Sequence, residues 1–440
     1  MDRLPVTPTH RRATVAVGLG LFFDLYEVFL AGVLSSVLSD EFQLTRAALA
    51  PVLASTFVGM FLGALVLGRV ADRFGRRGAF LFNIGLYSLF SLLGAFSPSA
   101  LWLMGTRFVA GIGLGAELPL ADTYLTDLLP ARRRGRYLAW AYTVSFLGVP
   151  FVGFLAKGLF EHTILGLAGW RWLFVIGALG AVLVFLLRRG LPESPRWLAA
   201  NGRHDEAERI VAALEEEARA AGQRLDAPAE VVAAGDGARR RVSELFGPAY
   251  RRRTWMMVVL QFFQTFGYYG FGTMVPLVLA AKGYPVSQSL LFTAVTFVGY
   301  PVGSALSLPV VERVERKFLI IGSVLGMAVF GLLFGSAGSM APILVFGFLY
   351  TAISNLFSNA YHIYQAEIFP TTLRATATGG TYSLSRLATA AMPFVLVPLL
   401  ASAGVVALFA VVSAALVIVA VDVAVLGPRT TGRSLEAVNR

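Results

Sequence analysis

The chain has 440 residues, of which 56% are hydrophobic and 14% are charged, and it contains no cysteine. Average soluble domains contain about 25% charged residues, so the composition excludes an ordinary water-soluble protein, and the absence of cysteine excludes disulfide and thiolate chemistry. The formal net charge of +11 could suggest nucleic-acid binding, but the basic residues fall mainly in a few alternate loops, which is a membrane topology signal.

Apolar stretches long enough to cross a bilayer dominate the chain, since a helical span needs roughly 20 apolar residues. The first stretch is too long for the core of a signal peptide, so we expect it to be retained. Six stretches precede a polar gap and six follow it: 14–38, 47–71, 78–96, 100–127, 136–160 and 170–187, then 253–281, 287–311, 318–337, 341–366, 375–401 and 403–426. The chain is therefore predicted to be an all-α membrane protein of twelve helices in two six-helix bundles, at 1–187 and 253–440.

The polar gap at 188–252 is the one long connection, and we interpret it as a linker between the bundles. Within it, Asp205 to Ala221 is rich in Ala, Glu and Arg and predicts a short surface helix. Lys and Arg gather on the side of this linker and are scarce on the other side, where Arg46, Arg171 and Lys282 stand almost alone. Because short cytoplasmic loops carry the excess of basic residues, both termini are predicted to be cytoplasmic.

A fixed offset of 240 residues relates landmarks in the two halves. The charged loop Gly68–Arg77 separates two apolar stretches, as does the loop around Arg313. The shift carries Asp72, Arg73, Arg76 and Arg77 onto Glu312, Arg313, Arg316 and Lys317, then Asp127, Pro130 and Arg134 onto Glu367, Pro370 and Arg374, and Phe22–Phe23 onto Phe262–Phe263. One offset that aligns several landmarks indicates an internal repeat.

Asp24 and Glu27 lie inside the first apolar stretch, where ionisable side chains are costly and are usually functional. Their spacing of three places both carboxylates on one face of a helix. Two close carboxylates in a low dielectric cannot both ionise cheaply, so one of them could take and release a proton at working pH. The alternative is a structural pair held by backbone groups or by a buried cation.

Arg386 lies about 11 residues into the eleventh stretch, or ~16 Å along a helix, close to the bilayer midplane. A buried guanidinium cannot lose its proton and needs an anion. That anion is either a protein carboxylate, with Asp24 and Glu27 as candidates, or part of a substrate. In the fourth stretch, Arg107 is expected to reach the membrane interface, and Glu117, near mid-span, is expected to face a cavity.

Aromatic and amide side chains crowd the seventh and tenth stretches, which suits the wall of a site for a flat organic molecule. The candidates for substrate binding, besides Arg386 and Glu117, are Gln261, Gln264, Tyr268, Tyr269, Asn355, Asn359 and Tyr361. Each could instead form hydrogen bonds between helices, and His362 is a weaker candidate for a proton relay. No phosphate-binding loop, nucleophile elbow or metal-spaced histidine pair is present in the sequence, so we expect no enzymatic activity, cofactor or metal.

With these motifs in place, the chain resembles transporters of the major facilitator superfamily. The run Gly68–Arg77 is similar to the loop between helices two and three of that superfamily, and Arg107–Gly111 resembles its fourth-helix motif. Pro192–Leu198, continuing through Gly202 and Arg203, resembles the signature that follows helix six in sugar porters. Asp127 to Gly135 and Glu367 to Arg374 are similar to the repeated acid-x-x-Pro-x-x-x-Arg elements. The second copy of the loop departs from the pattern, with Leu308 and Glu315 at the glycine positions.

Within the superfamily, the chain most resembles bacterial proton symporters of small organic acids, including aromatic acids and nicotinate. Asp24–Glu27 is similar to their acidic first-helix motif, and Arg374–Pro393, which contains Arg386, resembles their eleventh helix. Gly267–Gly270 resembles the nicotinate branch and animal organic-ion transporters. The paired glutamines followed by Gly-Ile-Asn that sugar porters carry are missing, which argues against a sugar substrate.

The resemblance implies that charged residues at the cytoplasmic ends form a lattice of ion pairs that holds the two halves together when the site faces outward. We call these the charged gate residues: Asp72, Arg73, Arg76, Asp127, Arg134, Glu193, Arg196, Glu312, Arg313, Glu367 and Arg374. An isolated exposed pair contributes only about 0–1 kcal/mol, but a network of several can bias an equilibrium between two states.

The sequence therefore predicts a monomeric, multi-pass protein of the bacterial inner membrane that imports a small organic anion with protons by alternating access. One alternative is a proton-coupled exporter of organic cations or amphipathic drugs, in which Asp24 and Glu27 bind the cation and Arg386 is held in a salt bridge. Another is a membrane sensor or scaffold that has lost transport. The cavity charges and gate motifs argue against the latter, because a protein without transport would have no need of them.

Overall fold

The computed structural model describes residues 4–225, 242–311, 313–369 and 371–430. The gate residue Glu312 and the repeat landmark Pro370 lie outside the described residues, as does the whole of 226–241. The side chains of Asp72 and Arg374 are also outside the described part. Within that part the chain is almost entirely helical, and its strands, β1 (Thr163–Ile164) and β2 (Leu167–Ala168), form one short antiparallel hairpin.

The first half of the chain folds into long helices that follow the predicted apolar stretches. Their bounds are α1 Pro8–Val33, α2 Ser35–Glu41, α3 Arg46–Phe74, α4 Arg76–Ala95, α5 Ala100–Gly115, α6 Glu117–Leu128, α7 Ala131–Phe146, α8 Gly148–Leu159 and α9 Gly169–Arg189. Side-chain caps mark several starts: the hydroxyl of Thr45 accepts from Ala48 N at 3.3 Å before α3, and that of Ser99 accepts from Trp102 N at 3.3 Å before α5. Gly75, at φ 97°, separates α3 from α4.

Two helices of the predicted linker follow, α10 Pro195–Ala200 and α11 His204–Ala220, so the predicted surface helix is present. After the short 3-10 helix η1 (Val242–Phe246), the second half contains α12 Arg251–Ala281, α13 Val286–Phe297, α14 Gly299–Val311, α15 Arg316–Ser336, α16 Met340–Glu367 and α17 Thr371–Leu426. The long α17 covers two predicted stretches, and its backbone leaves helical geometry at Gly404 (φ 80°, ψ −175°).

In the described part of the chain, nine helical stretches are long and apolar enough to cross a membrane. The predicted stretch at 100–127, which forms α5 and α6 with a break at Ala116, is not among them. The helix α12 is also not among them, and α17 is counted once. Every predicted stretch coincides with helix, whereas a count of twelve spans remains a prediction.

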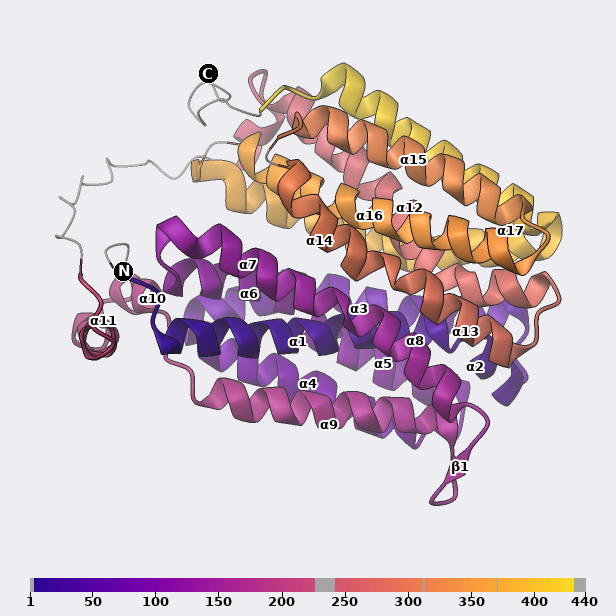
Figure 1. Ribbon diagram of the computed structural model, residues 1–440, viewed down its shortest axis with the longest axis horizontal. Helices are drawn as coiled ribbons and strands as arrows, with labels where there is room; N and C mark the ends of the chain where they lie inside the picture. Colours follow the sequence, from indigo (N-terminus) through magenta and orange to yellow (C-terminus); the bar gives the residue numbers. More distant parts are fainter. Residues whose placement is uncertain (1–3, 226–241, 312, 370, 431–440) are drawn as a thin grey trace.

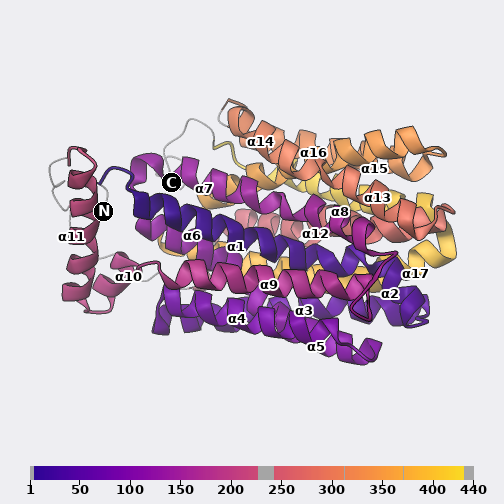
Figure 2. The same cartoon turned by 60° about the horizontal axis from the view of Figure 1, so that its bottom comes forward.

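The helices lie side by side in two groups, with α1–α9 in indigo to magenta below and α12–α17 in salmon to yellow above (Figure 1). The helices α10 and α11 project from one end of the molecule, which we call the α11 end (Figure 2). The start of α1 is tied to this end, because Thr9 N donates to the Glu217 carboxylate of α11 at 3.1 Å. The hairpin of β1 and β2 marks the opposite end.

The offset of 240 residues recurs in three-dimensional contacts. The rings of Phe22 and Phe23 meet edge to face at 5.1 Å and 77°, and those of Phe262 and Phe263 at 5.1 Å and 76°. The Tyr124 hydroxyl donates to Pro192 O at 2.9 Å, just after α9, and the Tyr364 hydroxyl donates to Pro428 O at 2.8 Å, just after α17. The repeat seen in the sequence is thus also a repeat of packing.

Glycine sets the same close helix contact in each half. A Cβ at Gly63 of α3 would lie 2.0 Å from Ile112 O of α5, and a Cβ at Gly303 of α14 would lie 2.0 Å from Ala352 O of α16. Gly303 and Ala352 lie 240 residues after Gly63 and Ile112, respectively. Small residues permit such approach where lipid supplies no hydrophobic drive between helices, so these positions hold the helix pairs that frame the centre of the molecule.

Candidate functional site

A small cavity of ≈ 40 Å³ lies between the two groups of helices. Leu25 of α1, Leu118 of α6 and three residues of α7 line it from the first half. Its full lining is Leu25, Leu118, Tyr142, Ser145, Phe146, Gln264, Tyr268, Tyr269, Ser358, Tyr361, His362, Tyr382 and Arg386. Five of the residues predicted to bind substrate are therefore together: Gln264, Tyr268, Tyr269, Tyr361 and Arg386. Sequence reasoning missed Tyr142 and Tyr382, which belong to no motif that distinguishes them from other tyrosines in apolar stretches.

Among the described residues, Arg386 is the one cation that lines this cavity, and its side chain is held by tyrosines. Its Nη2 donates to the Tyr269 hydroxyl at 2.7 Å, and its Cζ lies 4.6 Å from the Tyr269 ring centroid and 4.5 Å from that of Tyr382. The residue is 2% exposed, and neither Nε nor Nη1 has a hydrogen-bond partner among the described residues. Neither Asp24 nor Glu27 is its ion-pair partner, so its guanidinium keeps two donors for an anion.

A chain of amides leads from the cavity towards the α11 end. Gln264 Nε2 donates to Gln261 Oε1 at 3.4 Å, Gln261 Nε2 donates to Gln365 Oε1 at 3.2 Å, and Gln365 Nε2 lies 3.2 Å from His362 Nδ1. Gln261 therefore stands behind the lining rather than in it. The amide chain fixes the orientation of Gln264 and His362, which both line the cavity.

Asn355 and Asn359 do not line the cavity, contrary to expectation, because both join α16 to α14. Asn355 Nδ2 donates to Tyr300 O at 2.6 Å and its Oδ1 accepts from the Tyr268 hydroxyl at 3.0 Å. Asn359 Nδ2 donates to Ser307 Oγ at 2.6 Å. Asn355 thus positions the cavity residue Tyr268 without lining the site, which is the helix-joining role that the sequence left open.

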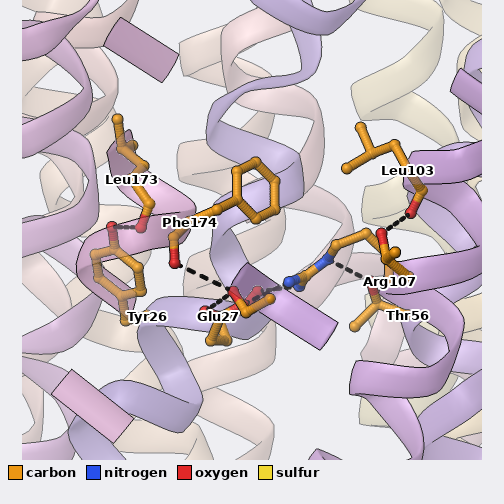
Figure 3. A network of polar contacts seen from close by, with 9 residues as sticks. Tyr26, Glu27, Thr56, Leu103, Arg107, Leu173 and Phe174 are labelled. Atoms are coloured by element: carbon orange, nitrogen blue, oxygen red, sulfur yellow. Dashed lines mark hydrogen bonds and ion pairs between the residues drawn. The ribbon is translucent and has the colours of Figure 1, made fainter. Parts of the chain in front are cut away.

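Glu27 forms a fully buried ion pair with Arg107 at the centre of the first half (Figure 3). Arg107 Nη1 contacts the Glu27 carboxylate, Nη2 donates to Glu27 O at 2.6 Å, and Nε donates to Thr56 Oγ1 at 3.2 Å. The Ser91 hydroxyl donates to Glu27 Oε1 at 2.5 Å. The expectation that Arg107 reaches the membrane interface is wrong, because these bonds hold its guanidinium inside the protein.

Glu117 does not line the cavity, because Arg188 holds it in a second buried ion pair. Arg188 was assigned to the linker from its position at the edge of an apolar stretch, yet α9 continues through it to Arg189. Its guanidinium also donates to the carbonyl oxygens of Ala16 and Val17, each at 3.3 Å, and is 1% exposed. Asp24 is 3% exposed, and neither of its carboxylate oxygens has a hydrogen-bond partner among the described residues.

Several charged gate residues contact groups within their own half at the α11 end. Glu193 Oε1 accepts from the backbone N–H of Arg76 at 2.9 Å and so caps α4. Asp127 Oδ2 accepts from Ser194 Oγ at 2.8 Å, and Arg316 pairs with Glu367 at 3.2 Å. Arg134 Nη2 donates to Leu129 O at 3.4 Å. The predicted lattice between the halves remains a prediction.

Aromatic side chains join the two halves on both sides of the cavity. Towards the α11 end, Tyr142 stacks on His362 with ring centroids 6.5 Å apart, and the Tyr142 hydroxyl donates to Asp122 Oδ1 at 2.6 Å. One turn beyond Leu25, towards the opposite end, Phe29 meets the rings of Phe297 at 5.7 Å and Tyr300 at 5.6 Å. The cavity is thus bounded on both sides by ring contacts between the halves.

The family model for "Sugar (and other) transporter" matches residues 13–440. The chain belongs to this family. Among its relatives, a putative metabolite transport protein of Bacillus subtilis is 31% identical over 391 residues, covering 88% of this chain and 85% of the relative. The niacin transporter NiaP of Acinetobacter baylyi is 31% identical over 441 residues, covering 100% of this chain and 98% of the relative.

Solved structures of xylose transporters share the fold. The partially occluded inward-open xylose transporter XylE of Escherichia coli has a TM-score of 0.79 at 20% identity, covering 97% of this chain and 99% of that chain. A crystal structure of a D-xylose-proton symporter has a TM-score of 0.75 at 21% identity, covering 96% and 99%. The predicted resemblance to the major facilitator superfamily is therefore confirmed.

Membership of the sugar transporter family makes this chain a transporter and not an enzyme. Its bacterial relatives and its many apolar helices place it in the inner membrane as a multi-pass protein. The family moves small molecules, and the proton-coupled mechanism is represented among its members.

Proposed function

We propose that the chain is a proton-coupled symporter that takes up a small organic anion, such as an aromatic carboxylate, by alternating access. In this proposal twelve membrane helices form two six-helix bundles, at 1–187 and 253–440, and the protein works as a monomer. The α11 end, with its excess of Lys and Arg, faces the cytoplasm. The ring contacts on either side of the cavity then alternate as inner and outer gates.

The proposal rests on the burial and the unpaired hydrogen-bond donors of Arg386. Its charge lies 2% exposed in the cavity wall, with tyrosine as its neighbour and with Nε and Nη1 unpartnered among the described residues. A buried cation without a carboxylate is costly unless an anion joins it. Oxygen atoms of a bound carboxylate substrate that accept from Nε or from Nη1 would satisfy these nitrogens with charge-assisted hydrogen bonds.

The remaining lining suits a flat, partly polar body. Tyr268, Tyr269, Tyr361 and Tyr382 supply ring faces, while Gln264 supplies an amide. Aromatic rings that pack edge to face or offset recognise planar ligands. The 31% identical relative named as a niacin transporter supports this class, since niacin is a heteroaromatic carboxylic acid.

Proton coupling is assigned in this proposal to the two carboxyl residues of α1, Asp24 and Glu27. Both are buried, and Leu25, which lies between them in α1, lines the cavity. Protonation of either would change the charge of the first half during transport, as a symporter requires. The exporter of organic cations receives less support, because Arg386 is not locked in a salt bridge with these residues.

The test is uptake of labelled nicotinate and benzoate into proteoliposomes with an acidic exterior and with no gradient. Wild type should accumulate at least one of them only with the gradient. Arg386→Ala should lose uptake, because a hydrogen bond to a charged group contributes about 1.5–3 kcal/mol, or roughly 10- to 150-fold in affinity. Arg203→Ala, at the exposed start of α11, is the matched control. Proton-driven movement of an organic cation, without carboxylate uptake, would overturn the proposal.

A further inference from the structure

The chain of side-chain amides beside the cavity has a definite direction. Gln264 Nε2 donates to Gln261 Oε1, Gln261 Nε2 donates to Gln365 Oε1, and Gln365 Nε2 lies 3.2 Å from His362 Nδ1. Each amide thus directs its NH2 group to the next acceptor. No single amide can be reversed alone, because one of its ends would then face a group of the same kind, donor to donor or acceptor to acceptor. The direction of the chain is therefore a property of all three amides together.

The end of this chain sets the tautomer of His362. An amide nitrogen only donates, so His362 Nδ1 accepts from Gln365 Nε2 and carries no proton. The neutral imidazole then has its proton on Nε2. Tyr142 and Tyr361 stack on the ring, with centroids 6.5 and 4.3 Å away, and these contacts restrict its rotation. His362 therefore presents one N–H donor in a fixed direction.

This donor is available to a molecule in the cavity. His362 is partly exposed, lines the cavity and has no hydrogen-bond partner at Nε2 in the described part of the chain. The hydroxyl and amide groups of the lining can either donate or accept, so they do not discriminate between donors and acceptors on a ligand. Among the described lining residues, Arg386 and His362 are thus the two whose side chains present donors only.

The two donors make different demands on a ligand. Arg386 of α17 has a permanent charge, which the carboxylate of the proposed substrate would satisfy. His362 of α16 is uncharged in this tautomer and lies close enough for the charge of Arg386 to act on it. A ligand that covers Nε2–H without accepting from it removes water from the donor and gives no hydrogen bond in return, which is costly. A benzene ring has no acceptor to offer, whereas a ring nitrogen with a lone pair in the ring plane does.

Resting on the symport function proposed above, we propose that His362 is a specificity-determining residue, which selects carboxylates with a hydrogen-bond acceptor in the ring, such as a pyridine nitrogen, over benzoate. The ring acceptor bonds to Nε2–H while the carboxylate bonds to Arg386. Gln365 does not line the cavity and is the positioning residue, because it acts on the ligand through the tautomer of His362. A ring that carries an N–H donor instead, as pyrrole does, would place donor against donor and be rejected.

The test measures binding to the purified full chain in detergent near neutral pH, where a pyridine nitrogen is unprotonated. The probes are benzoate, picolinate, nicotinate, isonicotinate and pyrrole-2-carboxylate. The readout is the rise of the thermal unfolding midpoint with ligand concentration, which reports affinity by mass action. Wild type should bind at least one pyridine carboxylate roughly fivefold or more tightly than benzoate, which is the contribution of one net hydrogen bond. It should bind pyrrole-2-carboxylate more weakly than benzoate.

Two variants separate the donor from its positioning residue. His362→Phe keeps an aromatic ring for the stacks on Tyr142 and Tyr361 but removes Nε2–H, so the preference for pyridine carboxylates over benzoate should disappear. His204→Phe makes the same change at the exposed start of α11 and should keep this preference. Gln365→Met removes the donor to Nδ1 and frees the tautomer. It should lose part of the preference for pyridine carboxylates and gain affinity for pyrrole-2-carboxylate relative to benzoate, a change that a purely structural role would not produce.

The proposed role of His362 is overturned if wild type binds benzoate as tightly as every pyridine carboxylate, if it prefers pyrrole-2-carboxylate, or if His362→Phe keeps the wild-type preference. If His362→Phe does not fold, Gln365→Met decides, and unchanged ratios of affinity in that variant have the same consequence. Benzoate binding that Arg386→Ala abolishes would leave the symport proposal standing in each of these cases. If wild type binds no carboxylate, both proposals fail.

Discussion

The buried pair of Glu27 and Arg107 allows a quantitative prediction about stability. Arg107→Met removes the guanidinium that contacts the Glu27 carboxylate, Glu27 O and Thr56 Oγ1. Of the contacts described above, the carboxylate keeps the Ser91 hydroxyl, at 2.5 Å. Because Glu27 is 0% exposed, removing its partner should cost about 3–5 kcal/mol, the usual cost of an unpaired buried charge.

The double variant Glu27→Gln/Arg107→Met should be more stable than Arg107→Met alone, because it leaves no buried charge. Replacement of a buried pair by neutral groups is often close to neutral in stability. The interaction energy of the double-mutant cycle should therefore be at least ~2 kcal/mol. The measurement is equilibrium unfolding of the purified protein in mixed micelles of detergent and denaturing surfactant.

Lys157→Met provides the control. Lys157 and Glu161 form an ion pair at 3.6 Å whose side chains are 33% and 58% exposed. Breaking such a surface pair should change the unfolding free energy by only ~0–1 kcal/mol. The reasoning is refuted if Arg107→Met is as mild as Lys157→Met, or if the double variant is less stable than the sum of the two single changes.

Three further predictions concern the cavity and the packing around it. Tyr269→Phe removes the hydroxyl 2.7 Å from Arg386 and should raise the KM for carboxylate uptake ~10-fold, since hydrogen bonds to charged groups contribute about 1.5–3 kcal/mol; an unchanged KM would contradict this role. Gly63→Ala places a Cβ 2.0 Å from a backbone oxygen of α5 and should greatly reduce the folded yield, whereas Gly78→Ala, with nothing within 4 Å, should be tolerated. Phe29→Ala removes the contacts of the Phe29 ring with Phe297 and Tyr300 and should lower the free energy of unfolding by about 3–5 kcal/mol. A loss no larger than that caused by replacing an exposed phenylalanine with alanine would contradict this prediction.

The helices and the repeat could be predicted from the sequence because both depend on local or periodic signals. In lipid, a spanning segment must form its backbone hydrogen bonds within itself, so long apolar stretches predict helices. The repeat is visible as a fixed offset, and the ring pairs Phe22–Phe23 and Phe262–Phe263 show that equivalent residues also make equivalent contacts. The membership of a transporter family follows from motifs that are contiguous in sequence.

The ion pairs could not be predicted in the same way. Glu27 and Arg107 are 80 residues apart, and Glu117 and Arg188 are 71 apart, so their contact depends on which helix faces meet. Arg188 also stood at the edge of an apolar stretch, where a basic residue ordinarily marks the water interface. The roles of polar side chains such as Asn355 could not be predicted from the sequence either, because an amide within a span can bind a ligand or form a hydrogen bond to a neighbouring helix.

The tyrosine contacts of Tyr124 and Tyr364 have a consequence for the energetics of transport. Each fastens the end of its own half, α9 in one and α17 in the other, and neither bond reaches across to the partner bundle. Rigid-body rocking of one bundle against the other can therefore leave both fasteners intact throughout the cycle. In the proposed alternating-access cycle, the contacts that must change are those between the halves, among them the ring contacts of Phe29 and Tyr142. Each half would then move as a preformed unit whose backbone hydrogen bonds stay inside its own helices.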